Sequence, residues 1–152
     1  MSKAELSVTG AYRVCIAPDQ TIEKLLETGH YEFISPYMRE LQFPRADYRV
    51  SRDEVHEIEL VYFGHDISTD DALKELDKRG LRPANAVELL AFGASFPDVQ
   101  REFPVVALGQ VFPYPHGSRN VVALGSLGEP RCVFVWPAHD WYDRCRFAAI
   151  RK

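Results

Sequence analysis

The sequence has no run of apolar residues long enough to cross a bilayer, and residues 1–5 lack the apolar core of a signal peptide. We therefore expect a cytoplasmic protein with no membrane partner. The three cysteines, Cys15, Cys132 and Cys145, are odd in number and not closely paired. That pattern argues against a disulfide framework and against a zinc knuckle.

Motifs for common chemistry are also missing. There is no GxGxxG, P-loop, HExxH or GxSxG pattern, so we expect no cofactor. No run of Lys and Arg indicates a nucleic-acid surface. The net charge of −4 is uneven, because residues 1–100 hold 11 Lys+Arg against 18 Asp+Glu, whereas residues 101–152 hold 7 against 4. The basic C-terminal third can therefore face an anionic partner, although a scattered set of solvated arginines is the favoured interpretation.

What is present has the composition of one globular domain over residues 1–152, with 46% hydrophobic and 26% charged residues. The pattern predicts an α+β fold, with N-terminal helices packed on a mainly antiparallel sheet. Helices are expected to start after Asp19 or Thr21, after Ser68 or Thr69, and after Asn85, and strands at residues 12–17, 47–63, 105–112, 120–125, 132–136 and 146–151. Because the last four strands are joined by short turns, they predict an antiparallel meander.

Residues 80–93 are the most informative stretch. Gly80 can end one helix in the left-handed conformation, and the residues around Pro83 form an extended link. Asn85 can cap the next helix, with Glu88 placed three positions later as in a capping box. Gly93 is expected to close that helix. A link defined this tightly would set the angle between the helices and the strands that follow.

Two groups of side chains invite either a functional or a packing interpretation. Aromatic residues after the first helix can form a ligand platform, but core packing is the favoured reading for them: Tyr31, Phe33, Tyr37 and Phe43. His56 lies among charged residues that look like a solvated face, so we expect it to be exposed and inert.

The best catalytic candidates lie near the C-terminus. A thiolate nucleophile needs a base and a group that orients the base, which Cys145, His139 and Asp140 can supply. Cys132 looks instead like a strand thiol that packs as a small hydrophobe. His139, Asp140 and Asp143 are also potential metal ligands, although a polar surface loop is favoured over a metal site.

The loop of residues 139–144 has the character of a binding loop. Trp and Tyr give large contact areas, and His, Asp and Arg give directional polar groups. An equally strong alternative is that Trp136 and Trp141 simply cover the end of the sheet. The candidate binding residues in this loop and in the preceding turn are Tyr114, His116, Arg119, His139, Trp141, Tyr142 and Arg144.

Residues 80–90 (GLRPANAVELL) resemble the RLPT-x-x-EL helix start of the formylglycine-generating-enzyme-like branch of the C-type-lectin-like fold. Residues 146–152 (RFAAIRK) resemble its closing GFR-x-x-R strand, although Arg146 stands where that pattern has glycine. The paired cysteines of the oxidase members and the calcium motifs of true lectins are absent. The resemblance therefore implies a relative of the non-enzymatic members, which include retroelement-diversified receptor-binding proteins. These present ligand-binding residues near the C-terminus, which here implies residues 113–119 and 139–144. The whole chain also resembles small bacterial and phage-type proteins, which implies no activity.

Three functions follow as hypotheses. The first is a non-enzymatic binding module that recognises a protein partner through its C-terminal loops. The second is a small thiol- or metal-dependent enzyme centred on Cys145 and His139. The third is an acidic inhibitor or immunity-type protein that docks on a basic target.

Overall fold

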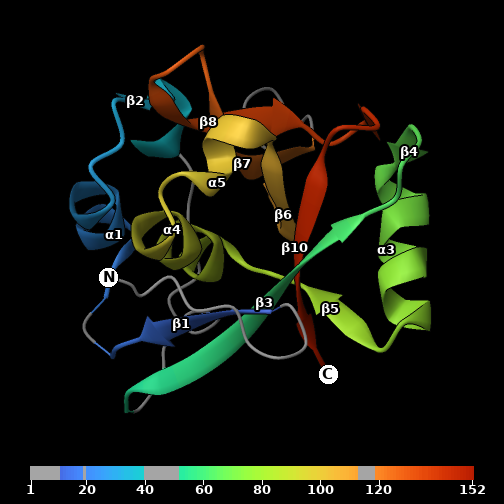
Figure 1. Cartoon of the computed structure of the whole chain (residues 1–152), viewed down its shortest axis with the longest axis horizontal. Coiled ribbons are helices and arrows are strands. Elements are labelled where there is room, and N and C mark those ends of the chain that lie inside the picture. The colour runs from blue at the N-terminus through green and yellow to red at the C-terminus, as the bar shows by residue number, and fades with distance from the viewer. Residues whose placement is uncertain (1–10, 19, 40–51, 113–118) are drawn as a thin grey trace.

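The computed structural model describes residues 11–18, 20–39, 52–112 and 119–152, and its centre is an eight-stranded sheet (Figure 1). The strand order is β1–β3–β10–β6–β7–β8–β2, and β5 pairs with β10 beside this path. The strands of the sheet are β1 (Tyr12–Ile16), β2 (Phe33–Ile34), β3 (Glu54–Tyr62), β5 (Leu81–Pro83), β6 (Val105–Phe112), β7 (Asn120–Ser126), β8 (Arg131–Pro137) and β10 (Arg146–Arg151). A separate two-stranded sheet joins β4 (Ile67–Ser68) to β9 (Asp140–Trp141).

Most neighbouring strands in the large sheet are antiparallel, which confirms the predicted α+β class. Strands β6, β7 and β8 form the expected antiparallel meander. The prediction that the last strand continues this meander is wrong, because β10 lies between β3 and β6, antiparallel to the first and parallel to the second. Phe147, Ala148 and Ala149 are all buried, and a strand buried on both faces fits the centre of a sheet better than its edge.

Helices cover both faces of the sheet (Figure 1). On one face lie α1 (Ile22–Thr28), α4 (Ala86–Ser95), the short α5 (Val99–Glu102) and the 3-10 turn η1 (Pro36–Arg39). On the other face α3 (Thr69–Lys78) buries Ala72 and Leu76 against β10 and β6. Among the described residues, no helix is both long and apolar enough to span a membrane.

The helix boundaries follow local chemistry. Thr21, Ser68 and Asn85 cap α1, α3 and α4, and Asn85 with Glu88 forms the predicted capping box. Gly80 has a φ of 74°, as expected for a residue that ends a helix in the left-handed conformation. The helix stop, extended link and helix start predicted between residues 80 and 88 are therefore confirmed.

Gly93 does not close its helix, because α4 continues to Ser95. A Cβ at position 93 would collide with the hydroxyl of Tyr31 and would lie 2.8 Å from Cδ1 of Leu124. The absence of a side chain at Gly93 therefore permits close packing between α4, Tyr31 and the sheet. The position does not require the backbone freedom of glycine.

Core packing of the aromatic segment is confirmed for one of its residues and wrong for two. Tyr31 is buried and donates a hydrogen bond of 3.0 Å to the carbonyl of Leu90. Phe33 and Tyr37 are 42% and 43% exposed, since β2 forms the edge of the sheet and η1 follows it on the surface. Phe43 lies outside the described residues. Val55, an apolar residue of the predicted second strand, is 55% exposed near the start of β3.

Candidate functional site

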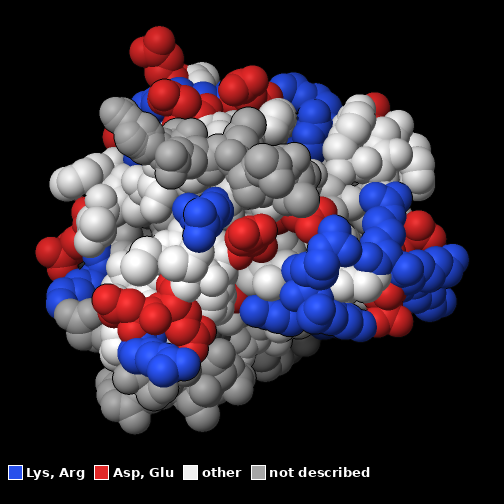
Figure 2. All heavy atoms as spheres, turned by 60° about the horizontal axis from the view of Figure 1, so that its bottom comes forward, with Lys and Arg blue, Asp and Glu red and all other residues white. Residues whose placement is uncertain are grey.

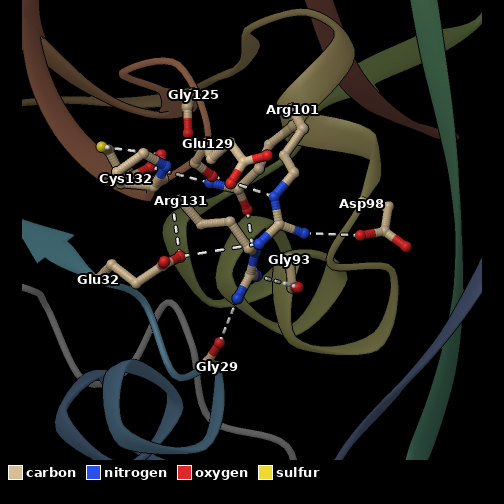
Figure 3. Close-up of polar contacts among 11 residues, drawn as sticks. Gly29, Glu32, Gly93, Asp98, Arg101, Gly125, Glu129, Arg131 and Cys132 are labelled. Carbon is tan, nitrogen blue, oxygen red and sulfur yellow. Dashed lines mark hydrogen bonds and ion pairs between the residues drawn. The ribbon is translucent and has the colours of Figure 1, made fainter.

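The side chain of Arg131, at the start of β8, holds three helices against the sheet (Figure 3). Its Nη1 donates to the carbonyl of Gly29 at 2.6 Å. Its Nη2 donates to the carbonyl of Gly93 at 2.7 Å and to Oε1 of Gln100 at 3.2 Å. The guanidinium also lies 4.6 Å from the centre of the Tyr31 ring. One planar side chain thus connects the ends of α1, α4 and α5.

Helix chemistry explains why a cation is stable in this buried position. Gly29 ends α1, and Gly93 lies near the end of α4, where carbonyl groups carry partial negative charge. The residue four positions after Gly93 is Pro97, which has no N–H to bond that carbonyl. Arg131 supplies the missing donor. Burial lowers the pKa of Arg131, but a guanidinium keeps its charge in proteins.

Gln100 fixes α5 over the ends of two strands. Its amide nitrogen donates to the carbonyls of Gly125 and Cys132, at 2.9 and 3.0 Å. On the exposed side of α5, Arg101 donates to the carbonyl of Glu129 at 3.1 Å and pairs with Asp98 at 2.6 Å (Figure 3). These contacts hold α5 against the end of β7, the start of β8 and the turn that joins them.

A hollow of about 230 Å³ is lined by residues of β7 and β8 near their shared turn and by the segment of residues 100–104. Phe134 and Trp136 line it, and their rings stack 4.8 Å apart with an interplanar angle of 13°. A Cβ on Gly125 would lie 2.9 Å from Cε2 of Phe134, so the absence of a side chain there leaves room for the ring. Leu127 and Arg144 complete two sides of the rim.

Apolar side chains extend from the hollow onto the surface. The ring of Phe33 lies 6.2 Å from that of Phe134, and Leu127 is 63% exposed. Phe33, Leu127, Phe134, Trp136 and Arg144 together are called the aromatic face below. Aromatic residues and arginine are enriched among the residues that contribute most of the binding energy at protein interfaces. The aromatic face combines both.

The cations beside the aromatic face are incompletely neutralised. Arg144 donates to the carbonyl of Glu102 at 3.2 Å but forms no ion pair with any carboxylate that the structure describes. Arg146 lies between the rings of Tyr62 and Phe103, 3.8 and 4.2 Å from their centres, and donates to the carbonyl of Arg144. Arg144 is therefore a cation without a described carboxylate partner, in a lining that also includes Glu102.

The structure separates the predicted binding residues. Trp141 is 4% exposed, its indole donates to Thr69 Oγ1 at 2.8 Å, and its ring packs against Trp136 and Phe147. This position agrees with the packing interpretation of Trp141. Tyr142 is 77% exposed.

His139 and Arg119 lie together at the corner next to α3. The carbonyl of His139 accepts hydrogen bonds from Thr69, and the carbonyl of Arg119 accepts one from Ala138. The Arg119 side chain is 3.6 Å from Asp70. Arg144 is the one predicted residue among those described that lines the hollow, while Tyr114 and His116 lie outside the described residues.

The thiols of Cys132 and Cys145 are poorly suited to nucleophilic catalysis. Cys145 is 2% exposed, and burial raises its pKa, as it does for Cys132. The hypothesis of a reactive thiol requires the opposite shift. Within the described ranges, no group of three or more His, Cys, Asp and Glu side chains is arranged to hold a metal ion.

A polar network at the start of α4 was missed by sequence reasoning. His56 is neither exposed nor isolated, because its Nδ1 lies 2.6 Å from Glu88 and its Nε2 lies 2.8 Å from Glu54. Glu88 is 1% exposed and also accepts two hydrogen bonds from Arg82 and one from the Asn85 amide. Hydrogen bonding to Glu88 raises the pKa of Arg82.

This network is satisfied internally and joins β3, β5 and α4. Glu88 could be recognised from the sequence as a capping residue, but its pairing with His56 depends on a contact 32 positions away. Since its carboxylate already accepts four hydrogen bonds, we assign it to fold stability and not to ligand binding.

Positive charge also gathers where α3 and β10 end and β5 begins, as Figure 2 shows on the right of that view. Its cations alternate with carboxylates in ion pairs, which include Arg151 with Glu59 at 3.1 Å and Lys78 with Glu75 at 3.2 Å. Arg79, Arg82 and Lys78 belong to the part of the chain that is acidic in sequence. The net charge of that part is thus not spread evenly over one acidic surface.

Comparison with known proteins adds no relative to this description. The chain matches no model of a protein family, no curated protein and no solved structure.

Proposed function

We propose that this protein is a non-enzymatic binding module and that the aromatic face is its recognition surface. The main support is the hollow lined by the stacked rings of Phe134 and Trp136 and bounded by Arg144. This proposal keeps the C-terminal location predicted from the sequence but moves its centre from Trp141 to Trp136. The C-type-lectin-like resemblance remains a prediction and is not needed for it.

The partner that fits this face is a protein segment with an apolar side chain and a nearby carboxylate. Phe33 and Leu127 offer apolar contact at the surface, and the hollow can accept an anchoring side chain. Arg144 lacks a described carboxylate partner and can pair with an acidic residue of the segment. The rigid attachment of α5 through Gln100 keeps the hollow formed before binding, which lowers the entropic cost.

Affinity capture from native extract with surface variants tests the proposal. Leu127→Asp and Arg144→Glu change the aromatic face, and Val55→Asp and Arg151→Glu make the same changes at exposed positions on β3 and at the end of β10. We expect one discrete partner to be lost with the first pair and kept with the second. Melting temperatures close to wild type in all four would show that the fold is intact. Equal capture by all four variants would contradict the proposal.

The enzyme hypothesis has less support. Cys145 is buried with a raised pKa, and His139 shares no hydrogen bond with it among the residues described. The inhibitor hypothesis overlaps with the proposed function, since both require a protein partner. They differ in the surface used, and the charge reversal Arg144→Glu separates them because it would strengthen docking on a basic target.

A further inference from the structure

A second and larger hollow, of about 670 Å³, lies between α1 and the segment formed by β2 and η1. It is independent of the aromatic face, because Phe33 points toward Phe134 whereas Ile34 packs with the core under α1. Leu26, Ile34 and Pro36 give this hollow an apolar lining, and buried Tyr31 forms part of its wall. Its volume is typical of pockets that hold a small organic ligand.

The rim of this hollow carries two carboxylates. Glu23 and Glu27 lie one helical turn apart on the exposed face of α1, and both line the hollow. Neither forms an ion pair or a side-chain hydrogen bond with a residue that the structure describes. Two carboxylates at this spacing repel each other by about 0.2–0.5 kcal/mol, so a cation placed between them relieves the repulsion.

His30 closes the same side of the hollow in an unusual backbone conformation. Its φ is 52°, in the left-handed region that costs a residue other than glycine roughly 1–2 kcal/mol. The residue follows the C-cap Gly29, and its amide donates to the carbonyl of Glu27 at 3.2 Å. The end of α1 therefore holds an imidazole over an apolar hollow with two carboxylates on its rim.

We propose that this hollow binds a small organic ammonium ion, that is, an amine carried on an apolar or aromatic body. The body lies against Leu26, Ile34 and Pro36, where its burial drives binding. The ammonium group lies at the rim between Glu23 and Glu27, which supply charge and hydrogen-bond acceptors. Neutral and anionic ligands of the same shape lack that attraction, so charge decides the selectivity.

The test uses three ligands of matched shape with the full-length protein. Phenethylammonium, 2-phenylethanol and phenylacetate share an aromatic body and differ in charge. Each is titrated while amide chemical shifts are followed by two-dimensional nuclear magnetic resonance. We expect saturable shifts with phenethylammonium at residues 23–36, and weaker or no response to the other two.

Variants identify the carboxylates as the cause. The double change Glu23→Gln with Glu27→Gln is expected to lower the affinity for phenethylammonium by about tenfold. The matched control, Glu57→Gln with Glu129→Gln, removes two exposed carboxylates on other elements and should leave the affinity unchanged. An equal response to all three ligands, shifts confined to other residues, no saturable shift, or full affinity in the Glu23/Glu27 variant would each overturn the proposal. Since each of these outcomes concerns binding of the ammonium ligand and not capture of a protein partner, they are distinct from a failure of the proposed function.

Discussion

Replacing Arg131 with methionine would remove the donor that connects three helices to the sheet. The side chain is 4% exposed, and its loss leaves the carbonyls of Gly29 and Gly93 and Oε1 of Gln100 without that donor. Each buried acceptor without a partner costs about 1–3 kcal/mol. Part of this free-energy cost is offset, because the substitution also removes a buried charge and a buried Nε that has no hydrogen-bond partner. We expect the free energy of unfolding to fall by about 3–5 kcal/mol.

Urea denaturation followed by far-ultraviolet circular dichroism measures this change as a lower midpoint with a similar slope. The control is Arg151→Met, which removes an exposed ion pair with Glu59 and should cost about 1 kcal/mol or less. Arg131→Lys keeps the charge but not the planar fork, so it should remain less stable than wild type. If Arg131→Met unfolds within about 0.5 kcal/mol of wild type, Arg131 does not hold the layers together.

Three further predictions follow from burial. Trp141→Ala should destabilise the protein by about 3–5 kcal/mol in the same denaturation assay, because it leaves a cavity next to Phe147; near-wild-type stability would restore Trp141 as a surface residue. Gly93→Ala should cost about 1–3 kcal/mol despite the better helix propensity of alanine, because its Cβ collides with the hydroxyl of Tyr31; a stabilised variant would contradict that packing. Thiol labelling should modify exposed Cys15 first. Because burial raises the pKa of Cys145, less thiolate exists at neutral pH, and its labelling should accelerate only at higher pH; fast labelling near pH 7 would refute this.

The parts of the fold that depend on neighbouring residues could be predicted from the sequence. The helix caps at Thr21, Ser68 and Asn85 involve hydrogen bonds over three positions, so residue types located Asn85 and narrowed each of the other two caps to a pair of nearby residues. Strand order could not be predicted in the same way. The position of β10 between β3 and β6 depends on contacts between distant parts of the chain, and short turns before a strand do not specify its neighbour.

The candidate site was predicted in part. Arg144 was identified by its residue type near an aromatic loop, and it does line the hollow. Choosing between Trp136 and Trp141 required the fold, because Trp136 lies near the end of β8 and Trp141 lies just beyond the next turn, and residue type does not show which of them is buried. A usable signal was present in β8, where Phe134 and Trp136 alternate with Val133 and therefore share the face opposite the α4 core. Leu127 is exposed because it lies in the turn between β7 and β8. Its apolar side chain alone would have predicted burial.

Burial reversed two expectations that rested on residue type alone. His56 was predicted to be solvated because its neighbours are charged, yet it faces Glu88 at the start of α4. Cys145 was considered a nucleophile because His139 is near it in sequence, yet the structure buries the thiol and raises its pKa. In both cases the strand or turn orients the side chain toward the interior, which composition does not reveal.

Photo-crosslinking from the aromatic face most directly tests whether it is the recognition surface. Leu127 is replaced with a photoreactive phenylalanine analogue, and the same analogue is placed at exposed Val55 as a control. In native extract, position 127 should crosslink one discrete protein through a segment that contains an acidic residue, and Arg144→Glu should abolish the product. If both positions give the same products, or if Arg144→Glu leaves crosslinking unchanged, the aromatic face is not the recognition surface.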